Sequence, residues 1–500
     1  MSLYALIISL LLLTTRKAGA TRDYDNLGTE FVLMFLQNID GSFELELFVT
    51  TYVNVPVHVN VTSPKWDSPR VDESYTITAG QVQMVTFSNN LRMSGTGKST
   101  KGILVTASDE IALYGFNKET YSTDGFLGLP TDVMGTAYYA MAYSPAKYQT
   151  ELGIAALFDS TEVSITHTGS TTIVSLDQYE TYQMTNSGDI SGAKIVANSP
   201  ISVFSGNKKT TIVPAGLSGW TSDHLVSHLP PVDTWGKELV AIPTPGRLNG
   251  DIVKIVASLP NTSVEVTGFP LQTIAESGGL LQLHIPFGQY SKIKASHPIM
   301  MMQFSITQTD SESSGDPAMT LVPWMEQYDS QYTFTTPSYS LGSYYNFLMV
   351  VIEDTHKTGL LLDGTGVSAS WTAYDGITLV STQLSITEGS HTILHDNSSA
   401  TFGVMMYGKA NYESYGLPAG LKLLQVNTEC IPSLNVDDDG VDNDCDGLID
   451  EEMCDVAGTG IDDDNDGAVD EDCWSGLPTT PAPTTTTHTT TTFELTTTTP

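Results

Sequence analysis

The sequence predicts an all-β fold built from tandem antiparallel modules. Three observations from residue 25 to about 424 favour it: short β-branched and aromatic runs of alternating polarity, Gly, Asn, Asp and Pro between them, and the lack of long helical periodicity. The runs at 43–55, 162–167, 252–257 and 347–352 are typical. A chain of 500 residues with 40% apolar residues can bury several cores, so we expect more than one folded module.

A repeat with a period of about 100 residues divides this region. Each unit is expected to open on an aromatic or apolar strand and to close on a strand pair, as at residues 193–204 and 291–302. A unit with about seven short strands fits an antiparallel sandwich. The sequence therefore predicts four tandem β modules, with a closed, propeller-like ring as the competing architecture. The expected module bounds are 25–134, 135–235, 236–328 and 329–424, within a β region of 21–424.

The first residues have the pattern of a secretory signal peptide at 1–20. An apolar run at residues 3–13 is followed by Ala18 and Ala20, the small residues that signal peptidase reads. We therefore expect a secreted, extracellular protein. No later run approaches the roughly 20 apolar residues of a membrane-spanning helix, so no membrane span is expected. Three N-x-S/T sequons predict glycosylation at Asn60, Asn261 and Asn397.

The charge of the chain excludes one class of partner. The formal net charge is −36, and nucleic acid and anionic lipid surfaces would repel such a chain. Cations are the better partners, and residues 429–473 contain no Lys or Arg.

The same segment, 429–473, holds every cysteine of the chain. In a secreted protein these are predicted to form disulfides, with three pairings open, among Cys430, Cys445, Cys454 and Cys473.

The acidic segment at 430–473 carries the strongest motif. The string DNDCDGLIDE at 442–451 recurs as DDDNDGAVDE at 462–471. Carboxylates at alternate positions of a tight loop converge on one hard cation, Gly permits the turn, and the next residue offers its carbonyl. The pattern resembles the EF-hand loop and the Asp-rich repeats of thrombospondin type 3, but Met453 and Cys473 stand where the EF-hand ends on Glu. The predicted Ca²⁺ ligands are Asp442, Asp444, Asp446, Leu448 and Asp450 in one loop and Asp462, Asp464, Asp466, Ala468 and Asp470 in the other.

The last segment, 476–500, is dominated by Thr and Pro. Such a composition cannot form a core, and its hydroxyls predict a mucin-like stretch that carries O-glycans.

One constellation could carry catalysis. His224 and His228 have the H-x-x-x-H spacing of a zinc site, and Asp223 precedes them. Pro230 and Pro231 follow at once and no Glu accompanies the pair, so a zinc-binding helix is disfavoured. We expect buried structural histidines and no enzyme. A secreted metal-dependent hydrolase that uses this region is the alternative function.

Several strings in residues 25–424 resemble the family of IgG Fc-binding protein N-terminal domains. The most specific are HLPPVDTWG at 228–236 and SYGLPAG at 414–420, and further matches lie at 28–32, 199–207 and 315–319. The resemblance implies an extracellular adhesive protein, associated with mucus or matrix, that binds glycoproteins or mucins. No binding residue transfers from a likeness of this kind.

One departure from the family pattern is local. Relatives often carry cysteines after the stretch at 199–207, whereas this chain has Lys208, Lys209 and Thr210.

A further alternative for the function is a structural one: a matrix component that acts by self-association, without a discrete ligand.

Overall fold

The computed structural model describes residues 24–39, 45–214, 216–309, 314–338, 342–374 and 376–426. The chain divides into two compact units, Met1–Asn427 and Thr428–Pro500, and every described residue belongs to the first. In these ranges the regular elements are strands and single turns of 3-10 helix, and the strands pair antiparallel in several sheets. The predicted all-β class is confirmed. No described helix is long and apolar enough to cross a membrane.

The first module is a sandwich whose two sheets share one long strand. Strand β7 pairs through its first half with β1 and β3, and through its second half with β2 and β8. The strands are β1 (Gly28–Leu33), β2 (Leu45–Thr50), β3 (Val57–Asp67), β4 (Arg70–Ile77), β5 (Val82–Phe87), β6 (Gly97–Ser99), β7 (Ile103–Glu119) and β8 (Ser122–Gly128).

The second module has the sheets β12-β11-β14-β9 and β16-β15-β10-β13-β6. Its strands are β9 (Ala137–Tyr139), β10 (Thr150–Ala156), β11 (Thr161–His167), β12 (Ser170–Leu176), β13 (Thr181–Asn186), β14 (Lys194–Ala197), β15 (Ile201–Thr210) and β16 (Asp223–Leu229). Strand β6 comes from the first module's stretch of chain but completes this sheet, with Gly97 opposite Gln183. The two modules are therefore joined by a shared sheet.

The third module has the sheets β17-β22-β19-β20 and β21-β18-β23-β24. Its strands are β17 (Glu238–Ala241), β18 (Asp251–Ala257), β19 (Thr262–Val266), β20 (Gln272–Ile274), β21 (Leu280–Ile285), β22 (Ser291–Ala295), β23 (Ile299–Ser305) and β24 (Met319–Leu321).

The fourth module has the sheets β25-β31-β27-β28 and β29-β30-β26-β32-β33. Its strands are β25 (Gln331–Thr335), β26 (Tyr345–Glu353), β27 (Leu360–Leu362), β28 (Thr365–Gly366), β29 (Thr372–Ala373), β30 (Leu379–Ile386), β31 (Ser390–His395), β32 (Gly403–Ala410) and β33 (Glu413–Pro418).

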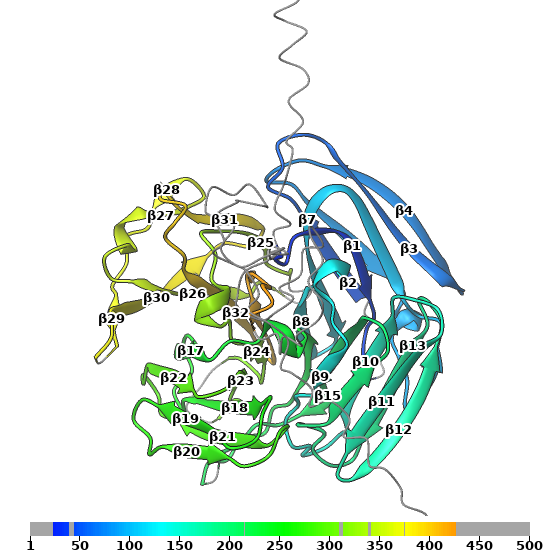
Figure 1. Ribbon diagram of the computed structural model, residues 1–500. Helices are drawn as coiled ribbons and strands as arrows, with labels where there is room; N and C mark the ends of the chain where they lie inside the picture. The colour runs from blue at the N-terminus through cyan, green and yellow to red at the C-terminus, as the bar shows by residue number, and fades with distance from the viewer. Residues whose placement is uncertain are drawn as a thin grey trace, which may run out of the picture. The chain divides into compact units, whose positions relative to one another are not determined.

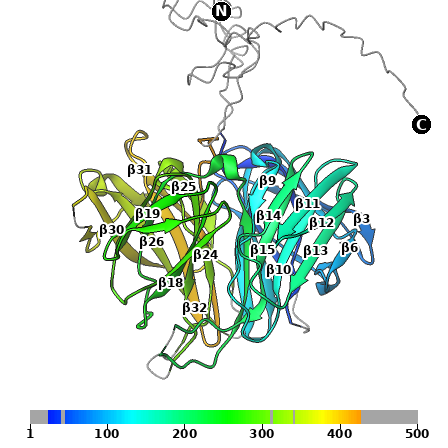
Figure 2. The ribbon, with the colours of Figure 1, turned by 60° about the horizontal axis from the view of Figure 1, so that its bottom comes forward.

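The four sandwiches are arranged around a common axis (Figure 1), and a second view shows their strands running along it (Figure 2). The last strand of each module, β8, β16, β24 or β33, packs against its counterparts from other modules. The first and fourth modules are in contact, because Asn26, before β1, donates its backbone N–H to the carbonyl of Leu421, after β33, at 3.0 Å. The modules are sandwiches, and they are arranged in a ring.

Burial follows position in the ring. Outer strands alternate between buried and exposed residues, as in β3, which is the pattern of a sheet with one solvated face. The axial strands β8, β16 and β33 are buried at every residue, because modules cover both of their faces. Trp235, in the turn after β16, is 1% exposed and donates its indole N–H to the Pro230 carbonyl at 3.1 Å. Seven of the nine residues of the HLPPVDTWG string are buried, so the string belongs to the packed interior.

Candidate binding groove

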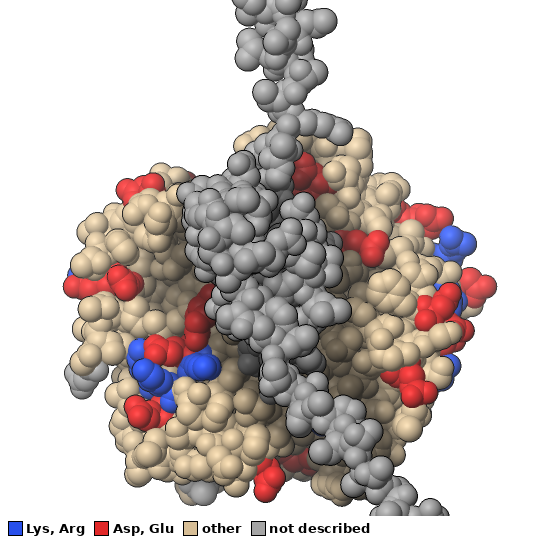
Figure 3. All heavy atoms as spheres, viewed as in Figure 1, with Lys and Arg blue, Asp and Glu red and all other residues tan. Residues whose placement is uncertain are grey.

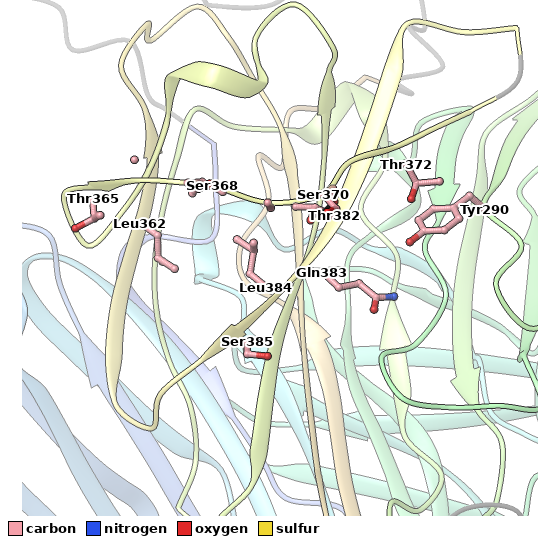
Figure 4. A pocket seen from close by; sticks show the side chains of 13 residues that line it. Tyr290, Leu362, Thr365, Ser368, Ser370, Thr372, Thr382, Gln383, Leu384 and Ser385 are labelled. Atoms are coloured by element: carbon pink, nitrogen blue, oxygen red, sulfur yellow. Dashed lines mark hydrogen bonds between the residues drawn. The ribbon is translucent and has the colours of Figure 1, made fainter.

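A groove of about 700 Å³ opens in the fourth module between β30 and the segment 365–370 (Figure 4). Leu384 and Ser385 on β30 form one wall, and Ser368 and Ser370 lie on the opposite segment. Tyr290, from the third module, stands at one end beside Thr372 (Figure 4). Its ring packs edge-to-face on Tyr374 with centroids 5.7 Å apart, which fixes that end of the groove.

The groove exposes an open edge of a sheet. Strand β26 pairs with β30 along its whole length, from Glu353 opposite Leu379 to Asn346 opposite Ile386. On the other side β29 reaches only Val380 and Ser381. Among the described strands none pairs with the rest of that edge, so the backbone groups of residues 383–386 on that side lack a strand partner. An edge of this kind can accept an additional strand.

The lining of the groove is uncharged and mixes polar with apolar side chains. Its hydroxyls come from Ser, Thr and Tyr290, and Gln383 supplies the one side-chain amide. The Thr382 hydroxyl donates to the Ser370 carbonyl at 2.9 Å, and Gln383 Nε2 donates to the Pro243 carbonyl at 2.6 Å. No Asp, Glu, Lys, Arg or His lines this groove, although the chain carries a net charge of −36. The arrangement suits a neutral, hydrogen-bonding ligand.

The one clear concentration of positive charge in Figure 3 lies over β17 and β22, and neighbouring acids neutralise it. Glu238 accepts from Lys292 at 2.5 Å and lies 3.4 Å from Lys294. The hydrogen bond from Lys292 lowers the pKa of the Glu238 carboxyl. We therefore do not assign an anion site there.

The two histidines of the predicted zinc spacing are structural. His224 Nε2 lies 3.0 Å from Asn117 Nδ2, and its Nδ1 lies 3.2 Å from the Lys208 carbonyl. His228 Nδ1 accepts the Leu129 N–H at 3.1 Å, and its Nε2 lies 2.9 Å from the Ser202 hydroxyl. Burial lowers the pKa of both imidazoles to about 3, so both are neutral. Every ring nitrogen is engaged within the protein, and the hydrolase alternative has no support.

Acidic side chains gather at the ring axis, which sequence patterns did not indicate. Asp124, Asp223, Asp316 and Glu413 lie at or near the starts of the four axial strands, and all four are buried. Burial raises the pKa of each carboxyl, to about 7 for Asp316. In the described part of the chain no group of three or more His, Cys, Asp or Glu residues is arranged to hold a metal ion.

The remaining predicted sites divide into two groups. The sequon residues Asn60, Asn261 and Asn397 are all exposed, so their side chains are accessible to modification. The predicted Ca²⁺ ligands in 442–470, the four cysteines and the Thr-rich segment 476–500 lie outside the described residues.

Comparison with known proteins decides the family. The model of the IgGFc binding protein family matches residues 124–408, from Asp124 on β8 to Gly408 on β32. The chain belongs to this family. The match takes in β16, β24 and most of β8, both buried histidines and the whole of the groove.

One curated member of the IgGFc binding protein family is similar over most of this chain. The human IgGFc-binding protein is 23% identical over 422 residues, which is 80% of this chain and 8% of the relative. This chain thus spans less than a tenth of that protein's length. Among solved structures, the major pilin of Streptococcus pyogenes aligns at 11% identity with a TM-score of 0.12, covering 54% of this chain and 98% of the pilin. That score is too low to indicate a shared fold.

Proposed function

We propose that this family member is a secreted, extracellular binding protein that recognises glycoprotein partners. The observation that carries the proposal is the open edge of β30 inside an uncharged groove. An extended peptide can add to such an edge through main-chain hydrogen bonds, while the flanking pockets select its side chains. Membership of a family named for binding to immunoglobulin supports a binding role over a catalytic one.

The chemistry of the groove favours one kind of partner segment. A lining of hydroxyls, one amide and small or apolar side chains, without charge, suits a neutral segment rich in Ser and Thr better than a charged one. The stalks of mucins have that composition and are extended. We therefore propose a mucin-type glycoprotein as the partner, and association with mucus or matrix as the setting. The Thr-rich segment 476–500 has the same composition, so a second copy of this chain is the competing occupant.

Further parts of the proposal rest on the sequence. We propose that the acidic segment 430–473 binds Ca²⁺ through its two Asp loops and that its cysteines pair in the oxidising environment outside the cell. We also propose N-glycans at the three exposed sequons, Asn60, Asn261 and Asn397, and O-glycans on 476–500.

The test uses the full secreted chain and an unglycosylated, neutral peptide with the Ser/Thr-rich sequence of a mucin stalk. The variant Ser385→Glu places a charge in the groove, and Ser175→Glu makes the same change at an exposed position of β12, remote from the groove. We expect Ser385→Glu to weaken binding at least tenfold and Ser175→Glu to leave it unchanged. Equal affinities in the two variants would overturn the groove as the site.

Two further arms decide the partner class. Immunoglobulin G, offered as competitor, should not displace the peptide. Displacement by immunoglobulin, absent in Ser385→Glu, would replace the mucin-type partner by an antibody. Concentration-dependent self-association that the same variant abolishes would make a second copy of this chain the occupant.

A further inference from the structure

Three aromatic side chains from three modules, two of them exposed and one half-buried, meet at the end of the ring where β8, β16 and β33 begin. Tyr121 precedes β8, Trp220 lies shortly before β16, and Tyr412 precedes β33. The Tyr412 ring packs edge-to-face against both others, with centroid distances of 5.5 Å to Tyr121 and 5.6 Å to Trp220. Trp220 is 55% exposed and Tyr121 46% exposed. Contiguous exposed aromatic surface of this kind is a feature of interaction sites.

The backbone of two of these residues is strained. Tyr121 and Tyr412 each hold the second position of a two-residue turn, between β7 and β8 and between β32 and β33, with φ of 59° and 66°. Gly or Asn adopts this left-handed conformation easily, whereas another residue costs on the order of 1 kcal/mol. Tyrosine occupies the same position in both turns, and both rings belong to the aromatic cluster.

A basic pocket adjoins these rings. Lys147, Lys208 and Lys209 line a hollow of about 460 Å³ together with Ile39, Tyr148 and Ser222, and no acidic residue lines it. Lys209 Nζ donates to the Tyr121 carbonyl at 2.6 Å, which joins the pocket to the aromatic cluster. Lys208 Nζ lies 5.8 Å from the centre of the Tyr148 ring. We call the pocket and the three rings the lysine–aromatic surface.

The lysines of this surface have no direct ion-pair partner among the described residues. Lys209 lies within electrostatic reach of Asp223 and Asp316, and Lys208 of Glu151, and burial raises the pKa of each of these three carboxyls. In a chain with 21 basic and 57 acidic residues, three lysines around one hollow form a local site of opposite sign.

We propose that the lysine–aromatic surface binds an anionic sugar residue, one that carries a sulfate ester or a carboxylate. Aromatic faces pack on the apolar face of a sugar ring, and ammonium groups make charge-assisted hydrogen bonds to its anionic substituent. The pocket uses lysine alone, which supplies point charges without the planar fork that arginine offers to peptide carboxylates and phosphates. This inference deepens the proposed function, since the groove would hold the peptide of a glycoprotein and this surface its glycan.

The test measures binding of three defined sugars to the full chain: sulfated lactosamine, sialylated lactosamine and unmodified lactosamine. The double variant Lys147→Gln/Lys208→Gln removes two charges from the pocket, and Lys194→Gln/Lys237→Gln removes two from exposed positions elsewhere. We expect tighter binding of an anionic sugar than of the neutral one and at least a tenfold loss in the pocket variant only. The difference between the two anionic sugars identifies which substituent is preferred.

Two further measurements keep the result interpretable. Trp220→Ala should weaken binding of the anionic sugar without changing its dependence on NaCl, whereas the pocket variant should flatten that dependence. Ser385→Glu should leave sugar binding intact, so failure of the groove and failure of this surface are distinguishable. Equal affinity for the three sugars, an unaffected pocket variant, or equally tight binding of a poly-glutamate peptide would each overturn the proposal.

Discussion

The Asp124 carboxylate on β8 accepts the backbone N–H of Gly416 on β33 at 3.3 Å, although 292 positions separate the two residues. The same side chain accepts the N–H groups of Val226 on β16 and Met319 on β24, both at 3.2 Å. A fourth bond comes from the adjacent Gly125 at 2.9 Å. One buried carboxylate of the first module thus contacts the axial strand of every other module, and it satisfies backbone groups that packing has removed from water.

Asp124→Asn should destabilise the ring. Each oxygen of Asp124 accepts two backbone N–H groups. In Asp124→Asn an amide NH₂ would replace one oxygen, so two of these N–H groups would face another donor and lose their acceptor. We expect a loss of roughly 2–4 kcal/mol in the free energy of unfolding, followed by thermal and guanidinium denaturation of the full chain. Asp72→Asn, at an exposed position on β4, is the matched control and should change stability by less than about 0.5 kcal/mol. Equal stability of the two variants would mean that the axis does not depend on this carboxylate.

The strands were predictable from the sequence, and the axis was not. Alternating polarity identifies a strand with one buried face, such as β11, because every second side chain faces the core. The prolines after His228 correctly argued against a zinc-binding helix. The role of Asp124 depends on strands far away in the sequence, and the groove depends on β29 pairing with only two residues of β30. Neither property leaves a local pattern, so the candidate site became visible only in three dimensions.

Asp251→Asn should remove a loss of stability that the wild-type β region undergoes between pH 4 and pH 8. Burial raises the pKa of Asp251 to about 6, although its Oδ2 accepts the Thr244 N–H at 2.9 Å. Because the folded state holds this proton more tightly than the unfolded state, stability is present below about pH 4 and is lost as pH rises through 6. Wild type should therefore lose about 2–3 kcal/mol from this group between pH 4 and 8, and the variant should not. The check compares the melting temperatures of both proteins across that range; parallel curves would contradict the assignment.

The buried histidines should make the folded state less stable as pH falls, the opposite of the pH dependence of Asp251. Burial lowers the pKa of His228 to about 3, so the unfolded state binds the proton more tightly, and stability is lost as pH falls below about 6.5. Protonation of Nδ1 would also break its bond to the Leu129 N–H. In nitrogen-detected NMR the His228 ring should not titrate between pH 5 and 8, whereas a histidine reference peptide does. A midpoint near 6.5 for His228 would show that the ring is accessible to water and reopen it as a ligand.

Calcium should control the acidic segment 430–473 and leave the β modules unaffected. Without a cation, the four carboxylates within each loop repel one another, and so short a segment has too little apolar content to fold alone. Calcium binding should therefore couple to folding of the segment, with a dissociation constant of roughly 10⁻⁴–10⁻³ M. Glu-C protease is the suitable probe, because residues 429–473 contain glutamates but no Lys or Arg for trypsin. We expect protection of the oxidised full chain in millimolar Ca²⁺ and cleavage within the segment in chelator.

Two double variants test the ligands of each loop, Asp442→Asn/Asp446→Asn and Asp462→Asn/Asp466→Asn. Each should raise the Ca²⁺ concentration needed for protection. The control Asp438→Asn/Asp455→Asn removes the same charge outside the two motifs and should leave that concentration unchanged. Cleavage at the same rate with and without Ca²⁺ would show that these carboxylates are solvated and bind no ion.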